Sequence, residues 1–142
     1  MTQLQVRNER LLDIFKTKSI SIPDFQRDYS WGEDEVGEFL ADALTSYHDK
    51  DKEYFFGSMV FIEDGEKLRI IDGQQRIITM LLSIIVIRDI LHQNNEVVNA
   101  SKLTAYTIDE ENTPAFPRIQ LNKINNKFND YLVSVSNNFL YF

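Results

Sequence analysis

The strongest constraint on this 142-residue chain is an apolar run over residues 77–87, which follows directly on a short polar segment, Asp72 to Arg76. The run is apolar on nearly every face of a helix. It therefore predicts a helix that continues to about Leu91, lies in the domain centre and emerges from Arg88 onward. The run is shorter than the roughly 20 residues that span a bilayer. The rest of the fold must therefore surround this helix, and its N-terminus must lie close to fixed structure.

Composition limits the classes to which the chain can belong. Its length fits one domain and its 43% hydrophobic residues can build a core, so a single α/β or α+β unit is expected. The net charge of -7 opposes nonspecific attachment to DNA or to an anionic membrane. The absence of cysteine excludes disulfides, thiolate metal sites and sulfiredoxin-type chemistry. Since the N-terminus also lacks an apolar signal-peptide core, a cytoplasmic protein without a membrane partner is expected.

Other segments predict helices and strands around the central helix. Apolar spacing predicts a short helix around Leu11 and a longer one from Glu33 to about Asp49. The sequences SISIP, YFFGSMVF and RIQL predict strands, the second of them a central one, and Asp-Gly within EDGE predicts a hairpin. Residues 96–116 read as a loop with some helix, and residues 124–135 as a last helix. The chain then stops on FLYF without a cap, which indicates a piece of a larger protein.

The polar segment DGQQR predicts an anion site. A strand that ends at Asp72 and leads into the buried helix puts Gln74, Gln75 and Arg76 in the first helical turn. There the backbone N–H groups are unpaired and the helix dipole is positive. Gly73 permits an unusual backbone angle, Arg76 can grip phosphate oxygens in a fork, and Asp72 can hold Mg²⁺ directly or through water. The alternative is structural: Asp72 is then the N-cap, Gly73 a turn residue and the rest a solvated turn.

A second Gln-Arg pair strengthens the functional interpretation. Gln26 and Arg27 lie in the loop IPDFQRDYSW among aromatic residues that include Trp31, the only tryptophan. An Arg in such a loop is often simply stacked on its neighbours. Two arginines in a net-acidic chain, each next to an apolar segment, are nevertheless explained together if one shared polyphosphate neutralises both. Arg27 and Arg76 are therefore predicted to face the same cleft. Ser58 either touches phosphate there or satisfies a backbone group.

These blocks resemble the N-terminal domain of GmrS/GmrD-type modification-dependent (type IV) restriction proteins, which is related to the ParB and sulfiredoxin fold. The resemblance covers residues 22 to about 91 in three blocks, IPDFQRDYSW, YFFGSMVF and DGQQRIITM, in the family's order. It implies an α+β fold in which a small mixed sheet packs with helices and a central buried helix follows the DGQQR turn. It also implies that residues 1–142 are one nucleotide-binding domain at the N-terminus of a larger restriction protein. Phe25 and Ile78 each lack a hydroxyl that the family usually carries, but neither change touches the Gln-Arg pairs.

The resemblance further implies a domain that binds and hydrolyses nucleoside triphosphates with Mg²⁺ and serves in the sensing of modified phage DNA. By matching position, the catalytic residues would be Asp72, Gln74, Gln75 and Arg76, with Asp72 also the metal ligand. The nucleotide would be bound by Gln26, Arg27, Gly73, Gln75 and Arg76, with Ser58 as a further candidate. A separate C-terminal nuclease domain or subunit with an HNH-like motif would cut the DNA.

Two other functions stay open at this stage. A non-catalytic sensor would bind nucleotide or modified DNA and only change conformation, with Tyr29 and Trp31 of the aromatic loop reading the modification. A nuclease within this domain is disfavoured, because the chain has only two histidines, His48 and His92, and no convincing carboxylate cluster. The chain alone is therefore not expected to cleave DNA. The base preference and the DNA modification are left undetermined.

Overall fold

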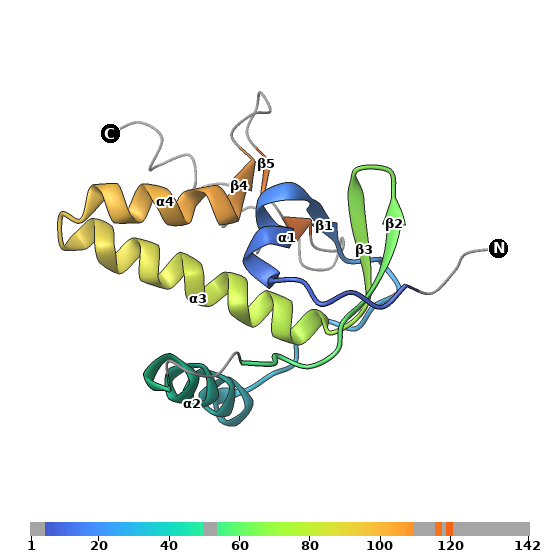
Figure 1. The fold of residues 1–142 in the computed structure, drawn as a ribbon, viewed down its shortest axis with the longest axis horizontal. Coiled ribbons are helices and arrows are strands. Elements are labelled where there is room, and N and C mark those ends of the chain that lie inside the picture. Colours follow the sequence, from blue (N-terminus) through green and yellow to red (C-terminus); the bar gives the residue numbers. More distant parts are fainter. Residues whose placement is uncertain (1–4, 50–53, 110–115, 118, 121–142) are drawn as a thin grey trace.

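A computed structural model describes residues 5–49, 54–109, 116–117 and 119–120, whose helices and strands are shown in Figure 1. The helices are α1 (Leu11–Thr17), α2 (Glu33–His48), α3 (Gln74–Gln93) and α4 (Val97–Thr107). The strands are β1 (Ser19–Ser21), β2 (Val60–Asp64), β3 (Lys67–Asp72), β4 (Ile108–Asp109), β5 (Phe116–Pro117) and β6 (Ile119–Gln120). This mixture confirms the predicted α+β class, together with the helices expected around Leu11 and from Glu33.

Strand β1 lies inside a small mixed sheet with the strand order β2-β3-β1-β6. It runs parallel to β3 and β6, whereas β2 and β3 form the antiparallel hairpin that Asp64-Gly65 predicted. Ile20 of β1 lies opposite Leu68 of β3 and Ile119 of β6, and all three side chains are buried. Because side chains alternate along each strand, this apolar row gives the sheet one buried face.

Helix α3 supplies much of the core. Its apolar side chains join one cluster with Phe15 of α1 and with the buried row of the sheet; the α3 members are Ile77, Ile78, Leu81, Ile84 and Ile85. Burying each such side chain stabilises the fold by about 1.5–3 kcal/mol. Helix α4 returns antiparallel along α3, while α2 lies on the other side of α3 in Figure 1. None of the described helices is long and apolar enough to cross a membrane.

The prediction for the burial of α3 was wrong in two respects. Arg88, expected to emerge from the core, is only 1% exposed, and its guanidinium donates to the Asp89 carboxylate at 2.9 and 2.7 Å. Val86, Ile87 and Ile90 are instead about half exposed. A charge can be buried when a partner satisfies its hydrogen bonds, so hydropathy alone did not identify the buried side of this helix.

The interpretation of YFFGSMVF as a central strand was also wrong. Residues 54–59 form neither helix nor strand, and β2 begins only at Val60, at the edge of the sheet. The carbonyl of Phe56 accepts a hydrogen bond from the side chain of Arg76. Its partner is therefore a side chain from α3, and not a neighbouring strand.

From residue 97 onward, the observed helices and strands agree better with those predicted from the sequence. RIQL does contain a strand, β6, whereas residues 97–107 form a regular helix in place of a loop with some helix. Packing along α3 stabilises this helix despite the two β-branched valines at its start, since tertiary contacts outweigh intrinsic propensity. The predicted helix over residues 124–135 lies outside the described residues.

Gly73 makes the turn from β3 into α3. It is the N-cap of α3 with a left-handed φ of 95°, and a Cβ there would lie 2.8 Å from Cγ of Met59. Both the backbone angle and the contact require the absence of a side chain. Asp72, which was considered as the N-cap, ends β3 instead, and no side chain caps this helix. The capping role proposed for Asp72 was therefore wrong.

Gly73→Ala is expected to lower the free energy of unfolding by about 1–3 kcal/mol, because Ala at positive φ is strained and its methyl group displaces Met59. Urea unfolding measures this change. The matched control is Gly37→Ala in α2, where a Cβ meets no atom within 4 Å. That variant should gain about 0.5–1 kcal/mol from helix propensity. Equal stability of the two variants would contradict the assignment.

Candidate functional site

Gln75 attaches the loop over residues 28–31 to the first turn of α3. Its Oε1 accepts from the backbone N–H of Ser30 at 2.9 Å and of Trp31 at 3.4 Å, and its Nε2 donates to the Asp28 carbonyl at 3.1 Å. Gln75 is only 5% exposed. One buried amide therefore satisfies three backbone groups of a loop that has no ladder of its own. These bonds leave Gln75 little capacity to contact a ligand through its side-chain oxygen.

Tyr29 adds a second attachment one helical turn further along α3. Its hydroxyl lies 2.8 Å from Oγ1 of Thr79, whose own proton is donated to the Gln75 carbonyl at 2.8 Å. Tyr29 is therefore the donor in this pair. Thr79 was not singled out in the sequence, because an isolated Thr inside an apolar run carries no pattern that reveals a partner fifty positions away.

Gln74 holds the same loop but keeps one atom unused. Its Nε2 donates to the Arg27 carbonyl, while its Oε1 is buried and has no hydrogen-bond partner among the described residues. Gln26 lies beside it and donates from Nε2 to the carbonyl of Ile71 at 3.1 Å. Leaving a buried acceptor unpaired costs about 1–3 kcal/mol, so this oxygen marks a position where a hydrogen-bond donor is missing.

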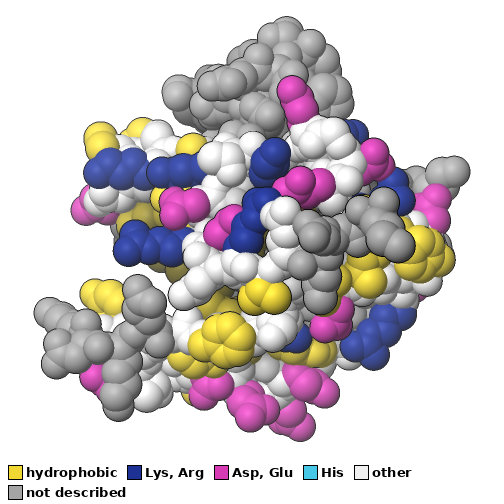
Figure 2. Space-filling model, turned by 45° about the vertical axis from the view of Figure 1, so that its right-hand side comes forward, with side chains coloured by type: hydrophobic (Ala, Val, Ile, Leu, Met, Phe, Trp, Pro, Cys, Tyr) yellow, Lys and Arg dark blue, Asp and Glu magenta, His cyan; other side chains and the backbone are white. Residues whose placement is uncertain are grey.

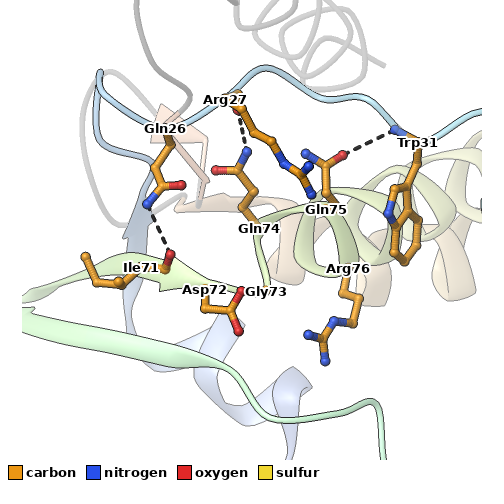
Figure 3. A pocket seen from close by; sticks show the side chains of 9 residues that line it. All are labelled: Gln26, Arg27, Trp31, Ile71, Asp72, Gly73, Gln74, Gln75 and Arg76. Carbon is orange, nitrogen blue, oxygen red and sulfur yellow. Dashed lines mark hydrogen bonds between the residues drawn. The ribbon is translucent and has the colours of Figure 1, made fainter.

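A pocket of about 210 Å³ opens at this point, between β3, the start of α3 and the aromatic loop (Figure 3). Its lining contains most of the residues predicted from the two Gln-Arg pairs: Gln26, Arg27, Trp31, Ile71, Asp72, Gly73, Gln74, Gln75 and Arg76. Arg27 and Arg76 thus line the same pocket. Ser58 is exposed and does not belong to this lining.

The charged groups of this pocket differ in their surroundings. The side chains of Arg27 and Asp72 are exposed and make no hydrogen bond or ion pair with the described residues. Arg76 instead donates from Nη1 to the Phe56 carbonyl at 2.9 Å and points away from Arg27 in Figure 3. Gly57, with φ of 90°, makes this position available, because a Cβ there would lie 1.9 Å from Nη1 of Arg76. The guanidinium of Arg76 therefore lies against residues 56–57, within the segment that was predicted to be a strand.

A second pocket of about 270 Å³ shares the walls formed by Trp31 and Arg76. Its other walls are aromatic side chains, carboxylates of α2 and one glycine: Glu35, Glu38, Phe39, Asp42, Tyr54, Phe55, Phe56 and Gly57. Acidic side chains also gather along the lower edge of the molecule in Figure 2, the level at which α2 lies in Figure 1. The sequence patterns did not identify this pocket, because its two halves come from separate segments.

Tyr54 and Asp42 are bonded within this second pocket. The Tyr54 hydroxyl donates to Oδ2 of Asp42 at 2.9 Å. Desolvation raises the pKa of the Tyr54 phenol above its ordinary value, and the hydrogen bond to Asp42 and the charges of Asp42 and Glu38 raise it further. Tyr54 therefore stays protonated at neutral pH and remains a donor to Asp42.

Within the described part of the chain, no three His, Cys, Asp or Glu side chains are grouped so as to hold a metal ion. A magnesium ion carried in by a polyphosphate needs fewer protein ligands, commonly one or two carboxylates, because phosphates and water complete its octahedron. The carboxylate of Asp72, which lines the pocket and makes no hydrogen bond or ion pair with the described residues, is an oxygen ligand of the kind Mg²⁺ takes. The residues present therefore fit such an ion.

The fold and the pocket define a small α+β domain with a polar site where a strand, a helix N-terminus and an aromatic loop meet. A family model described as the GmrSD restriction endonuclease, N-terminal domain, matches residues 11–141, and the chain belongs to this family. The match confirms the resemblance to this restriction family and includes both Gln-Arg pairs. A search of curated proteins found no match. The relation to ParB and sulfiredoxin stays a prediction.

Gln75→Ala is expected to loosen the aromatic loop, because it leaves three backbone groups without their partners. A loss of about 2–3 kcal/mol follows from net hydrogen-bond contributions near 1 kcal/mol each. Urea unfolding measures the loss, and acrylamide quenching of Trp31, the only tryptophan, should increase. Gln93→Ala, at the exposed opposite end of α3, is the control. Unchanged quenching in Gln75→Ala would show that the loop is held by other contacts.

Proposed function

We propose that the pocket at the start of α3 binds a nucleoside triphosphate with Mg²⁺ and hydrolyses it. The observation that carries this proposal is the Gln74 Oε1, buried without a partner in a pocket that also contains the unpaired Arg27. Such an oxygen needs a donor, whereas Arg27 and the positive end of α3 need an anion. A polyphosphate with a hydrated metal ion offers both, since its phosphates are anionic and its bound water molecules are donors.

The role of each residue then follows from its charge and from the hydrogen-bonding atoms that have no partner among the described residues. Arg27 and the first-turn N–H groups of α3 bind phosphate oxygens. Gln74 accepts a hydrogen bond from the attacking water through Oε1, and Asp72 holds Mg²⁺ directly or through water. Gln75 positions the loop that carries Arg27, and so acts through other residues. Bound Mg²⁺ neutralises charge that develops on the phosphates.

The reaction needs no covalent intermediate. The oxygen of the oriented water bonds to the γ-phosphorus as the bond to the bridging oxygen breaks. The protons of the water pass to phosphate oxygens and to solvent, and the products are nucleoside diphosphate and inorganic phosphate. Positioning and charge neutralisation account for catalysis in such reactions, and the pocket supplies groups for both.

Membership of the restriction family places this domain in antiphage defence. We propose that the nucleotide is coupled there to recognition of modified phage DNA and to cleavage by a C-terminal nuclease domain or subunit of HNH type. The exposed Phe25 and the partly exposed Trp31 support the aromatic loop as the surface that contacts the DNA.

A second candidate function is a sensor in which nucleotide changes the conformation of the aromatic loop without being hydrolysed. The direct bonds from Gln75 to this loop support it. Binding without phosphate release favours that sensor.

Arg27→Ala should weaken binding of nucleoside triphosphate with Mg²⁺ about tenfold, the effect of losing one charge-assisted contact. Arg76→Ala should also weaken it, because the substitution removes a second positive charge from the pocket lining together with the bond to the Phe56 carbonyl. Calorimetric titration measures the dissociation constants. The double variant should be less than additive if both residues hold the same phosphates. Arg10→Ala, which removes an exposed charge outside both pockets, is the control. Full additivity would separate the two arginines into different sites.

Asp72→Asn and Gln74→Ala should each lower the rate of phosphate release about 100-fold, the loss typical of removing one group that acts on the reacting atoms. Nucleotide dissociation constants should change much less. Both variants should fold, because neither side chain caps α3 and the loop that Gln74 contacts keeps its three bonds to Gln75. A phosphate-release assay at saturating nucleotide and Mg²⁺ measures the rates. Glu66→Gln, on the exposed hairpin turn, controls for the change in charge. Wild-type rates in both variants would remove these residues from the hydrolytic step.

A further inference from the structure

The second pocket adjoins the first, because two residues line both. Trp31 and Arg76 line both, so a ligand long enough to reach past these two side chains would contact both pockets. The two pockets differ in character. The first has a helix N-terminus and an unpaired Arg27, whereas the second has aromatic walls and the carboxylates of α2. A ligand that fits both is anionic at one end, flat and apolar at the other, and carries N–H donors at the flat end.

The aromatic walls form a connected set of rings. Trp31 lies 5.8 Å from Phe39, Phe39 lies 5.4 Å from Phe56, and Phe56 lies 4.6 Å from Tyr54 between ring centroids. Phe39 is buried and fixes the set against α2, while Phe55 on the pocket wall is 74% exposed. Such rings offer faces on which a nucleobase can stack, an interaction that tolerates any base.

The carboxylates of this pocket are not equally available. Glu35 accepts from the N–H of Gly32 at 2.9 Å, and Asp42 accepts from Tyr54 at 2.9 Å. Glu38 lies one turn from each on the same face of α2 and makes no hydrogen bond or ion pair with the described residues. A ligand that displays N–H groups in this pocket therefore meets a free carboxylate at Glu38.

We infer that the second pocket binds the base of the nucleotide whose phosphates occupy the first, and that Glu38 makes the site prefer guanine. The inference rests on the proposed nucleotide site. Guanine presents two adjacent donors, N1–H and the 2-amino group, which a carboxylate accepts together in a bidentate pair. Adenine presents an acceptor beside its amino group, and uracil presents one N–H between two acceptors, so each brings a lone pair towards the carboxylate.

An organic cation is the other ligand that aromatic rings and carboxylates attract. The guanidinium of Arg76 forms part of the pocket wall and repels such a cation. The adjoining pocket, where Arg27 and the positive end of α3 lie, disfavours a cation further. A neutral base joined to phosphates satisfies both observations.

Titration of the full chain with GTP, ATP, ITP and tripolyphosphate, each with Mg²⁺ at one ionic strength, tests the inference. GTP should bind about tenfold more tightly than ATP, the discrimination expected of one bidentate pair. ITP keeps N1–H but lacks the 2-amino group, and should fall between them. Tripolyphosphate has no base and should bind most weakly. Stacking of guanine should also quench the fluorescence of Trp31.

Glu38→Gln should reduce the ratio of GTP to ATP affinity to roughly threefold or less and leave tripolyphosphate binding unchanged. Asp34→Asn is the control, because it removes one charge from the same helix without lining either pocket. Equal binding of GTP, ATP and tripolyphosphate would overturn the inference and leave the phosphate site intact. A guanine preference that Glu38→Gln does not change would also overturn it. If none of the four compounds binds, the proposed nucleotide site fails, and the base pocket fails with it.

Discussion

The buried amide of Gln75 is the interaction on which the candidate site depends. It joins the first turn of α3 to a loop some 45 residues earlier in the chain and satisfies three of its backbone groups. A loop without a ladder of its own would otherwise leave those groups unpaired. Gln74 bonds to the carbonyl of Arg27 as well, so two side chains of the first helical turn attach the loop to α3, and the pocket lies between them.

Two glycines determine where the neighbouring Arg76 can go. Gly73 lets β3 turn into α3 close to Met59, and Gly57 leaves room for the Arg76 guanidinium beneath the segment before β2. Arg76 consequently lies between two pockets and presents its charge to both. The same arrangement sets a pocket at the N-terminus of α3 beside an aromatic and acidic one. The proposal of a nucleotide, and not an inorganic anion, rests on this contrast between two adjoining pockets.

The parts of the fold that follow from local pattern were predictable. The α2 helix, the Asp64-Gly65 hairpin and the polar first turn of α3 each carry their signal within a few residues. The prediction of a central strand over YFFGSMVF was wrong, because the β-rich composition of this segment does not reveal that the Phe56 carbonyl accepts a hydrogen bond from Arg76. The prediction that Arg88 is exposed was wrong for a related reason. Its burial depends on the carboxylate of Asp89 and on packing, which hydropathy does not report.

By itself, the sequence determined that two Gln-Arg pairs stand next to apolar segments and that one of them opens a long apolar helix. Helical geometry then places Gln74, Gln75 and Arg76 in a turn with unpaired N–H groups, whatever surrounds it. Only the tertiary structure decided how the two glutamines differ. Gln75 is occupied by the loop, whereas Gln74 retains a buried oxygen without a partner. Neighbouring residues on a helix point about 100° apart, so identical side chains meet different parts of the protein, and the chain sequence does not state which parts those are.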